Sequence, residues 1–399
     1  MTRDGARFDL EIRPDVFMGE DLLARVEKME VEATVDGADE LRLTVAPWDA
    51  DRKRWLFGPG EPLAAGSEVV AWVGYGSDLW ALQAFRIEHR RAPLKAGSSP
   101  RLEIIGYSPE AKMAQNETPR SWTGPISDAQ IVRELAELYG FAHDGDTIED
   151  TPNRSTGRTK ERGTTDWQFV RSLAYENGFG EPSVRWSPGA RRYVFTWRQT
   201  NLRHQDEIAT FRLDPEDRQR STLLAFDGAY SLSGAPSAVE VVGWDAAKGE
   251  AVKIRVTVDQ GGQQAVAYRG KAAASVDARI RSGSQLQVAT LNASGEPLAE
   301  RPEVLTLEGG VALRDAGAIE AWAKRYLATR NRGFLTADAT TVGYERAWIG
   351  QVHRFLGLPP EFEGSYEANT VRHEFNRGAY RCRWDLRALI DELPIREEG

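Results

Sequence analysis

Cysteine is almost absent from this 399-residue sequence, in which Cys382 stands alone. A single cysteine excludes an intrachain disulfide and a thiolate metal cage formed by one chain, and it fits a reducing compartment. Long apolar runs are also lacking, and none approaches the roughly 20 residues that a helix needs to cross a bilayer. The first residues alternate charged and apolar side chains, so no signal peptide is visible. We therefore expect no membrane insertion.

An excess of positive charge is missing as well. The chain has 51 Lys and Arg against 60 Asp and Glu, which gives a formal net charge of −9. This balance argues against a surface that neutralises phosphates, so we expect no specific nucleic-acid partner. The hydrophobic fraction of 41% and the charged fraction of 28% are typical of a globular chain, and the length suits two or three domains.

A period of two runs through the sequence from its start to about residue 107. Apolar residues alternate with polar ones from Met29 to Val35 and from Leu41 to Val45, with the turn residues Asp36-Gly37 between them. This pattern predicts an antiparallel meander in which one face of the sheet is exposed to solvent. From Val69 to Tyr75 both alternating sets contain apolar residues. We expect that strand to pack on a core with one face and on a partner with the other.

Helical patterns occupy the middle of the chain. Ser127 and Gln130 have the spacing of a capping box, and so do Thr165 and Gln168, so two short capped helices are predicted. The polar stretch 144–162 between them is predicted to be an exposed loop. A hairpin is predicted around residues 187–190, with these apolar residues facing one another: Val184, Trp186, Tyr193, Phe195 and Trp197. The middle region is therefore predicted to be a small α/β domain.

Strand patterns return in the last part of the chain. They run through residues 239–243, 252–258, 371–375 and 380–386. Asp315 is predicted to cap one helix over about 315–332. Residues 391–399 form a predicted acidic tail. The fold class predicted for the whole chain is α+β, mainly β.

Motifs that carry catalysis or bind metals are incomplete. His373-Glu374 begins like a zinc-protease signature, but Arg377 stands where the second histidine is needed, and the pair lies in a predicted strand. Gly270-Lys271 lacks the upstream glycine and the downstream hydroxyl of a phosphate-binding loop. The other histidines are scattered without ligand spacing: His89, His143, His204 and His353.

Structural explanations are preferred for three further features. The acidic cluster from Asp144 to Asp150 lacks the glycine and the terminal glutamate of a calcium loop. Cys382 lies in an alternating strand and is predicted to be a small buried hydrophobe rather than a nucleophile. Arg90-Arg91 and Arg191-Arg192 are predicted to be solvated or salt-bridged. We therefore predict no catalytic, metal-binding or cofactor-binding residue and no cofactor. A carboxylate pair for glycoside cleavage stays open, because its separation is a property of the fold.

Several segments, taken in their order along the chain, carry a resemblance to a known family. They are Pro59-Gly60, Glu68–Val70, Gly74–Gly76, Thr165–Gly178, Val241–Asp245, Gly364–Tyr366, His373, Phe375 and Tyr380. Together they resemble the phage late-control D protein family, which comprises baseplate hub proteins of contractile phage tails and injection systems. The hub portion of type VI secretion spike proteins belongs to the same group.

The resemblance implies a structural protein rather than an enzyme. Hubs of this family are implied to be homotrimers in which each chain supplies two tail-tube-like antiparallel β-barrels. Three chains then match the hexameric tail tube to the trimeric central spike. The implied domains are a first barrel over 1–108, a small α/β domain over 109–228 and a second barrel over 229–390.

The implied partners are a tail-tube or tube-initiator protein, other baseplate wedge proteins and a separate central spike, because the sequence shows no spike needle after its second β region. The implied setting is assembly in the bacterial cytoplasm and incorporation into a phage or injection-particle baseplate. Phage, tail bacteriocin, extracellular injection system and gene-transfer particle all stay open. Two other functions also stay open: a cell-surface or carbohydrate-binding β module, and a cell-wall hydrolase.

Overall fold

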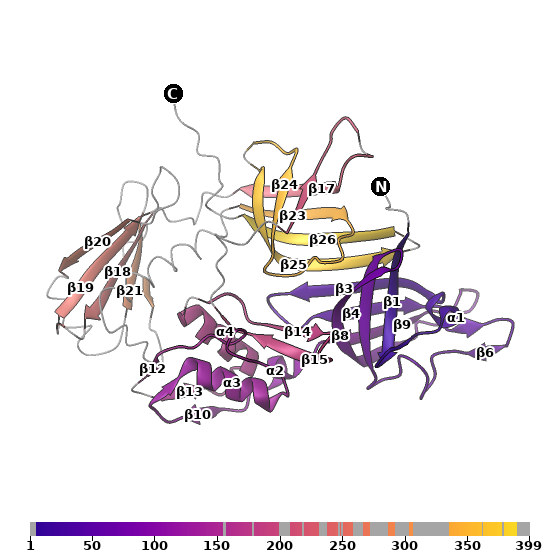
Figure 1. Cartoon of the computed structure of the whole chain (residues 1–399), viewed down its shortest axis with the longest axis horizontal. Helices are drawn as coiled ribbons and strands as arrows, with labels where there is room; N and C mark the ends of the chain where they lie inside the picture. The colour runs from indigo at the N-terminus through magenta and orange to yellow at the C-terminus, as the bar shows by residue number, and fades with distance from the viewer. Residues whose placement is uncertain are drawn as a thin grey trace.

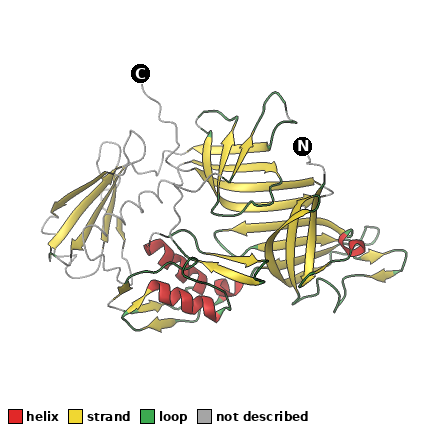
Figure 2. Ribbon diagram, viewed as in Figure 1, coloured by secondary structure: helices red, strands yellow, loops and turns green. Residues whose placement is uncertain are grey.

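The structure is a computed structural model that describes residues 5–154, 157–177, 179–198, 208–217, 219–230, 238–245, 248, 250–257, 266–271, 286–291, 303–305, 335–360, 362–376 and 379–388. The chain is mainly β with few helices, as predicted. Most of the helical residues gather in one part of the molecule (Figure 2). The predicted helix over about 315–332 and the acidic tail 391–399 lie outside the described residues.

One large sheet contains strands from both ends of the chain (Figure 1). Its strands are β1 (Ala6–Arg13), β2 (Val16–Phe17), β3 (Val26–Thr34), β4 (Glu40–Val45), β7 (Glu68–Tyr75), β8 (Asp78–Arg91), β9 (Leu102–Tyr107), β16 (Ala209–Arg212), β17 (Leu223–Tyr230), β23 (Leu335–Val342), β24 (Val352–Leu356), β25 (Gly364–Asn376) and β26 (Ala379–Ala388). Their order is β17-β23-β26-β25-β3-β4-β9-β8-β7-β1-β2, with β24 pairing β25 and β16 pairing β24. Neighbours are antiparallel except for β16 and β24. Within the described ranges this pairing is an open path and does not close into a ring.

The period of two predicted for the first strands is confirmed. Met29, Val31 and Ala33 of β3 are fully buried, and so are Leu41 and Leu43 of β4. The polar residues between them are partly or fully exposed. Each strand therefore presents one face to the core and one to solvent, as alternation requires.

β3 and β25 join the two ends of the chain. They pair antiparallel from Thr34 opposite Thr370 to Lys28 opposite Asn376. As a result, strands from both ends fill one hydrophobic core, which includes Leu10, Val31, Phe85, Phe211, Phe355, Val371 and Trp384.

The middle of the chain has a core of its own. Its elements are α2 (Ala111–Gln115), β10 (Arg120–Trp122), β11 (Ile126–Ser127), α3 (Asp128–Leu138), β12 (Asn153–Arg154), β13 (Arg158–Lys160), α4 (Asp166–Asn177), β14 (Ser183–Ser187) and β15 (Arg192–Thr196). The short strands pair as β10-β13, β11-β12 and β14-β15. The core between them includes Ile131, Leu135, Val170, Leu173, Phe195 and Trp197. The predicted hairpin is confirmed as β14 and β15, with Val184 opposite Phe195 and Trp186 opposite Tyr193.

Both predicted capping boxes are confirmed. The Ser127 Oγ accepts a hydrogen bond from the Gln130 backbone N at 3.1 Å, and the Ser127 backbone N donates to the Gln130 Oε1 at 2.9 Å. In the second box, the Thr165 Oγ1 accepts from the Gln168 backbone N at 3.1 Å, and the Thr165 backbone N donates to the Gln168 Oε1 at 3.0 Å. Each box satisfies two backbone amides at the start of a helix that would otherwise lack a partner.

The prediction of an exposed loop over 144–162 was wrong for its second half. β12 and β13 lie there, and Arg158 and Lys160 are buried, with exposed fractions of 4% and 0%. Burial of these two cations is possible because carboxylates at the starts of α3 and α4 lie beside them.

The second face of β7 is covered by the same chain. Val70 packs with Ala81 and Ala84 of β8, against Trp186 and Tyr193 of the β14-β15 hairpin. The sequence correctly predicts two covered faces for this strand, but an element of this chain supplies the cover over Val70.

A second sheet of five strands lies apart from the large one in Figure 1. Its order is β20-β19-β18-β21-β22, from β18 (Ala238–Asp245), β19 (Glu250–Thr257), β20 (Val266–Lys271), β21 (Leu286–Leu291) and β22 (Glu303–Leu305). β16 and β17 precede it in the chain and pair within the large sheet. The predicted domain boundary at residue 228 therefore falls inside the large sheet.

Two small elements remain at the first end of the chain: α1 (Glu20–Leu23) and a hairpin of β5 (Trp48–Asp49) with β6 (Arg54–Trp55). Of the helices that the structure describes, none combines the length and the apolar character needed to span a membrane.

Leu173 tests the second core. It is fully buried on α4, so Leu173→Ala is expected to lower the free energy of unfolding by about 2–5 kcal/mol through the cavity that it leaves. Leu138→Ala, at the 53% exposed end of α3, is the matched control and is expected to cost about 0.5 kcal/mol or less. Denaturant unfolding measures both, and equal losses would contradict the placement of Leu173 in the core.

Candidate functional site: a buried polar junction

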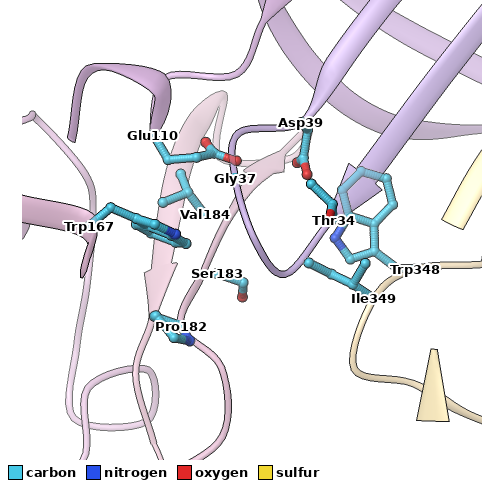
Figure 3. Close-up of a pocket in the computed structure, with 10 residues that line it drawn as sticks. All are labelled: Thr34, Gly37, Asp39, Glu110, Trp167, Pro182, Ser183, Val184, Trp348 and Ile349. Carbon is cyan, nitrogen blue, oxygen red and sulfur yellow. The ribbon is translucent and has the colours of Figure 1, made fainter. Parts of the chain in front are cut away.

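Three parts of the chain meet around a small cavity beside the buried carboxyl groups of Asp39 and Glu110 (Figure 3). We define the polar junction as these two residues together with the buried Gln83 and Ser108 and the half-buried Arg185. The cavity is lined by Thr34, Gly37, Asp39, Glu110, Trp167, Pro182, Ser183, Val184, Trp348 and Ile349. The lining residues come from the first strands, from the middle domain and from the segment between β23 and β24.

Gln83 connects the large sheet to the middle hairpin. Its Nε2 donates to the Asp39 Oδ2 at 3.0 Å and to the Val184 carbonyl at 2.7 Å, and its Oε1 accepts from the Trp186 backbone N at 2.9 Å. Gln83 is fully buried, and each of these bonds lies inside the protein or at its margin. Ser108 anchors the other side, because its Oγ accepts from the Asp39 backbone N at 2.9 Å.

The two carboxyl groups of the polar junction bind protons more tightly than free carboxyls. Burial raises the pKa of Asp39 to about 6, although the Gln83 hydrogen bond and the positive charge of Arg185 lower it. Burial, and then the negative charge of Asp39, raise the pKa of Glu110 well above its ordinary value. Two carboxyls this close in a dry site do not ionise independently.

Arg185 supplies the positive charge on this side of the junction. Burial lowers its pKa to about 10, so it stays protonated at neutral pH. Its guanidinium lies 4.4 Å from the ring centroid of Trp348, which is within the range of a cation–π contact. Arg185 thus ties the middle domain to the last part of the chain.

Paired carboxyls with raised pKa values are also what general acid–base catalysis uses. The small volume of the cavity beside Asp39 and Glu110 argues against a catalytic role for this pair. The cavity measures about 10 Å³, which holds about one water molecule and is far too small for a sugar ring. Asp39 and Glu110 are one carboxyl pair that the fold brings together, and they connect parts of the chain rather than hold a glycoside.

His373 and Cys382, singled out from the sequence, lie side by side on β25 and β26. The Cys382 Sγ is 3.6 Å from the His373 Nδ1, which also lies 2.8 Å from the Tyr380 hydroxyl, while the His373 Nε2 is 3.0 Å from the Ala347 carbonyl. Burial lowers the pKa of His373 to about 4 and raises that of Cys382 to about 12. Thiol and imidazole are both neutral at pH 7, so no reactive thiolate forms. The burial predicted for Cys382 is confirmed.

The acidic cluster after α3 is organised as a turn. The Asp144 Oδ1 accepts from the backbone N atoms of Asp146 and Thr147 at 2.9 and 3.0 Å. Across the ranges that the structure describes, no three His, Cys, Asp or Glu side chains are placed to hold a metal ion.

One arginine doublet is salt-bridged at the edge of the middle domain. The Arg191 Nη1 lies 2.9 Å from the Glu11 Oε1, and its Nη2 contacts Asp15. In the other doublet, the Arg91 Nη1 lies 3.9 Å from the Glu103 Oε2. The sequence predicts that the arginines of these doublets are either solvated or salt-bridged, and each doublet contains a salt-bridged arginine.

Sequence reasoning missed two buried ion pairs of the middle domain. The Lys160 Nζ lies 2.5 Å from the Asp166 Oδ1, and the Arg158 Nε lies 3.0 Å from the Asp128 Oδ1. Asp128 and Asp166 are the first residues of α3 and α4. The repeated Asp at the start of a capped helix is the signal that could have pointed to cations nearby.

Comparisons with known proteins identify the fold. No protein-family model matches this chain, and no curated protein matches it by sequence. The crystal structure of the tail protein from Neisseria meningitidis MC58 matches with a TM-score of 0.58 at 12% identity, covering 98% of this chain and 100% of that one. The 43 kDa tail protein of prophage MuSo2 from Shewanella oneidensis matches with a TM-score of 0.58 at 11% identity and the same coverage. The resemblance to phage tail proteins is thus confirmed as a shared fold over nearly the whole chain.

Asp39 gives a pH-dependent prediction. Its pKa is higher in the folded chain, so between about pH 4 and pH 6 the folded chain holds a proton that the unfolded chain has released. The contribution of Asp39 to the free energy of unfolding therefore falls as the pH rises through this window. Relative to the unchanged chain, Asp39→Asn is expected to remove that fall. Asp36→Asn, at an exposed position nearby, is the control and keeps it. Identical pH profiles for Asp39→Asn and the unchanged chain would contradict the prediction.

The buried ion pair of Lys160 with Asp166 gives a second prediction. Lys160→Met removes the nearer cation of the buried Asp166 and leaves only the Arg120 Nε, 4.0 Å from the Asp166 Oδ1, so it is expected to lower the free energy of unfolding by about 3–5 kcal/mol. Adding Asp166→Asn removes the stranded charge and is expected to recover at least half of the loss. Thermal or denaturant unfolding of both variants measures this, and no recovery in the double variant would show that the charge is not the cause.

Proposed function

We propose that this chain is a structural baseplate hub protein of a contractile phage tail or injection system. In this proposal it forms a homotrimer that adapts the hexameric tail tube to the trimeric central spike. The single observation that carries the proposal is the fold that the chain shares with two phage tail proteins over 98% of its length.

The strand order supports two tube-like barrels in each chain. β1, β7, β8, β9, β4 and β3 follow one another in the first half of the large sheet, and β16, β24, β25, β26, β23 and β17 form its second half. In the second half, the Thr222 backbone N donates to the Arg212 carbonyl at 2.9 Å. That bond brings β16 and β17, the two ends of the second set, together. We propose one barrel from each set, with the middle domain between them in the chain.

The domain boundaries in this proposal follow the sheets. The first barrel occupies 1–108 and the middle α/β domain continues to about residue 208, where β16 begins the second barrel. The sheet of β18 to β22 is inserted in the sequence between β17 and β23 of that barrel. Two barrels in each of three chains would present six similar units to a six-fold tube.

A structural role rather than an enzymatic one is supported by the described side chains. The buried carboxyl pair has room for about one water molecule, and the cysteine–histidine pair is neutral. The proposed partners are a tail-tube or tube-initiator protein, baseplate wedge proteins and a separate central spike. We propose assembly in the bacterial cytoplasm and a final place in the baseplate of the particle.

The solution mass tests the proposal. A homotrimer of the 44.4 kDa chain is expected to give about 133 kDa by light scattering after size exclusion. Its projection in negative-stain images is expected to be a ring with three-fold symmetry. A chain that stays at 44.4 kDa over a concentration series, and also when mixed with its tube protein, would contradict the proposal.

A further inference from the structure

The β5-β6 hairpin presents a tryptophan and three cations to solvent. We call residues 48–57 the basic hairpin. Trp55 is 52% exposed, and Arg52, Lys53 and Arg54 beside it are all exposed. The hairpin pairs outside the large sheet and lies at the far right of the molecule in Figure 1, where β6 is labelled.

Local contacts hold the exposed Trp55 ring in place. The Asp49 Oδ1 accepts from the backbone N atoms of Asp51 and Arg52 at 3.2 Å each, and the Arg25 Nη1 donates to the Trp48 carbonyl at 3.3 Å. The ring of Trp48 meets that of Trp55 edge to face, with centroids 5.2 Å apart. An ordered, half-exposed tryptophan beside several cations is suited to bind a segment that is both apolar and acidic.

The sequence of this chain contains such a segment. Residues 390–398 read Ile-Asp-Glu-Leu-Pro-Ile-Arg-Glu-Glu, with four carboxylates, one cation and three large aliphatic side chains. The exposed tip of the basic hairpin, from Asp51 to Trp55, has three cations and one carboxylate. Their charges are opposite, and each has apolar surface to bury against the other.

The register of the large sheet places the last described residue before this segment far from the strand end that the basic hairpin follows in the same chain. Ala388 pairs with Tyr366, at the opposite end of β26 from Ala379, whereas the hairpin follows the end of β4 at Val45. Val45 lies near the level of Ala379, because β25 pairs Asn376 with both Ala379 and Lys28. About ten residues of strand, or about 33 Å, therefore separate Ala388 from the level of Val45.

The reach of the segment falls short of that distance. The seven residues from Ala388 to Ile395 span at most about 25 Å when fully extended. The basic hairpin follows Val45 in the sequence, and three strand spacings, about 14 Å, separate β26 from β4. The extended segment is thus shorter than the separation along the sheet, which favours contact with the hairpin of another copy.

We propose that the basic hairpin of one copy binds the acidic segment 390–398 of a second copy. Trp55 packs against Leu393 and Ile395, and the three cations face the four carboxylates. This inference rests on the self-association included in the proposed function, and it names one contact by which copies hold one another.

A labelled peptide tests the contact directly. The probe is a fluorescent peptide of residues 389–399, titrated into the chain that lacks these residues, with anisotropy as the readout. Binding is expected to weaken by about tenfold or more in R52E/K53E/R54E, and also on raising the salt concentration, because the contact is charge-dependent. R162E/R192E/R220E, which reverses three exposed cations elsewhere, is the matched control and is expected to bind as the unchanged chain does. No binding, or equal binding to both triple variants, would overturn the inference.

The mass of the full chain separates this inference from the proposed function. Reversing the carboxylates in D391K/E392K/E397K/E398K is expected to raise the concentration at which the oligomer dissociates by about tenfold, and combining it with R52E/K53E/R54E is expected to restore association. A trimer whose peptide does not bind would refute the contact and leave the hub proposal standing. A monomer that still binds the peptide at the hairpin would refute the trimer and support the contact.

Discussion

The pairing of β3 with β25 is the contact on which the rest of the structure depends. It joins residues 340 positions apart, such as Glu32 and Arg372, and turns two sets of strands into one sheet. Without it, each set would expose a strand edge, and the shared core would be divided into two smaller ones. The entropy of closing so long a loop exceeds that of a short one only modestly, because it grows with the logarithm of loop length. Seven paired residues with alternating buried side chains are enough to hold the two ends together.

The polar junction places the middle domain on this sheet in one position. Apolar contacts such as those of Val70 and Trp186 tolerate sliding, whereas the bonds of Gln83 to Asp39 and Val184 exist in one geometry only. The buried charge of Asp39 carries a cost, seen in its raised pKa, which apolar residues would avoid. Fixed geometry is what such groups contribute in return.

Local chemistry made part of this fold predictable. Capping residues such as Ser127 and Thr165 act on neighbours three positions away. The alternation in β3 depends only on which face of the strand is exposed to solvent. Partners distant in sequence were not predictable. Alternation shows which residues of β3 and β25 are buried, but it does not show that the two strands are neighbours. The polar character of Lys160 led to the wrong prediction that it is exposed, because the sequence does not show that Asp166 lies beside it in the fold. Likewise, nothing in the sequence around Asp39 or Glu110 shows that the fold brings them together, so the polar junction could be found only in the structure.

The β3–β25 pairing can form only late in synthesis, after β25 has left the ribosome. β3 emerges from the ribosome early, while β25 follows more than 300 residues later, which at ordinary elongation rates is a delay of about 20–70 s. Throughout that interval one edge of β3 is available to any other chain on the same polysome. The edge is protected by its own sequence, since Glu27, Lys28, Glu30 and Glu32 place charges along it, and charged side chains discourage strands from adding to an open edge. The side chains that later form the wet face of the finished sheet thus first serve to keep the unfinished one from aggregating.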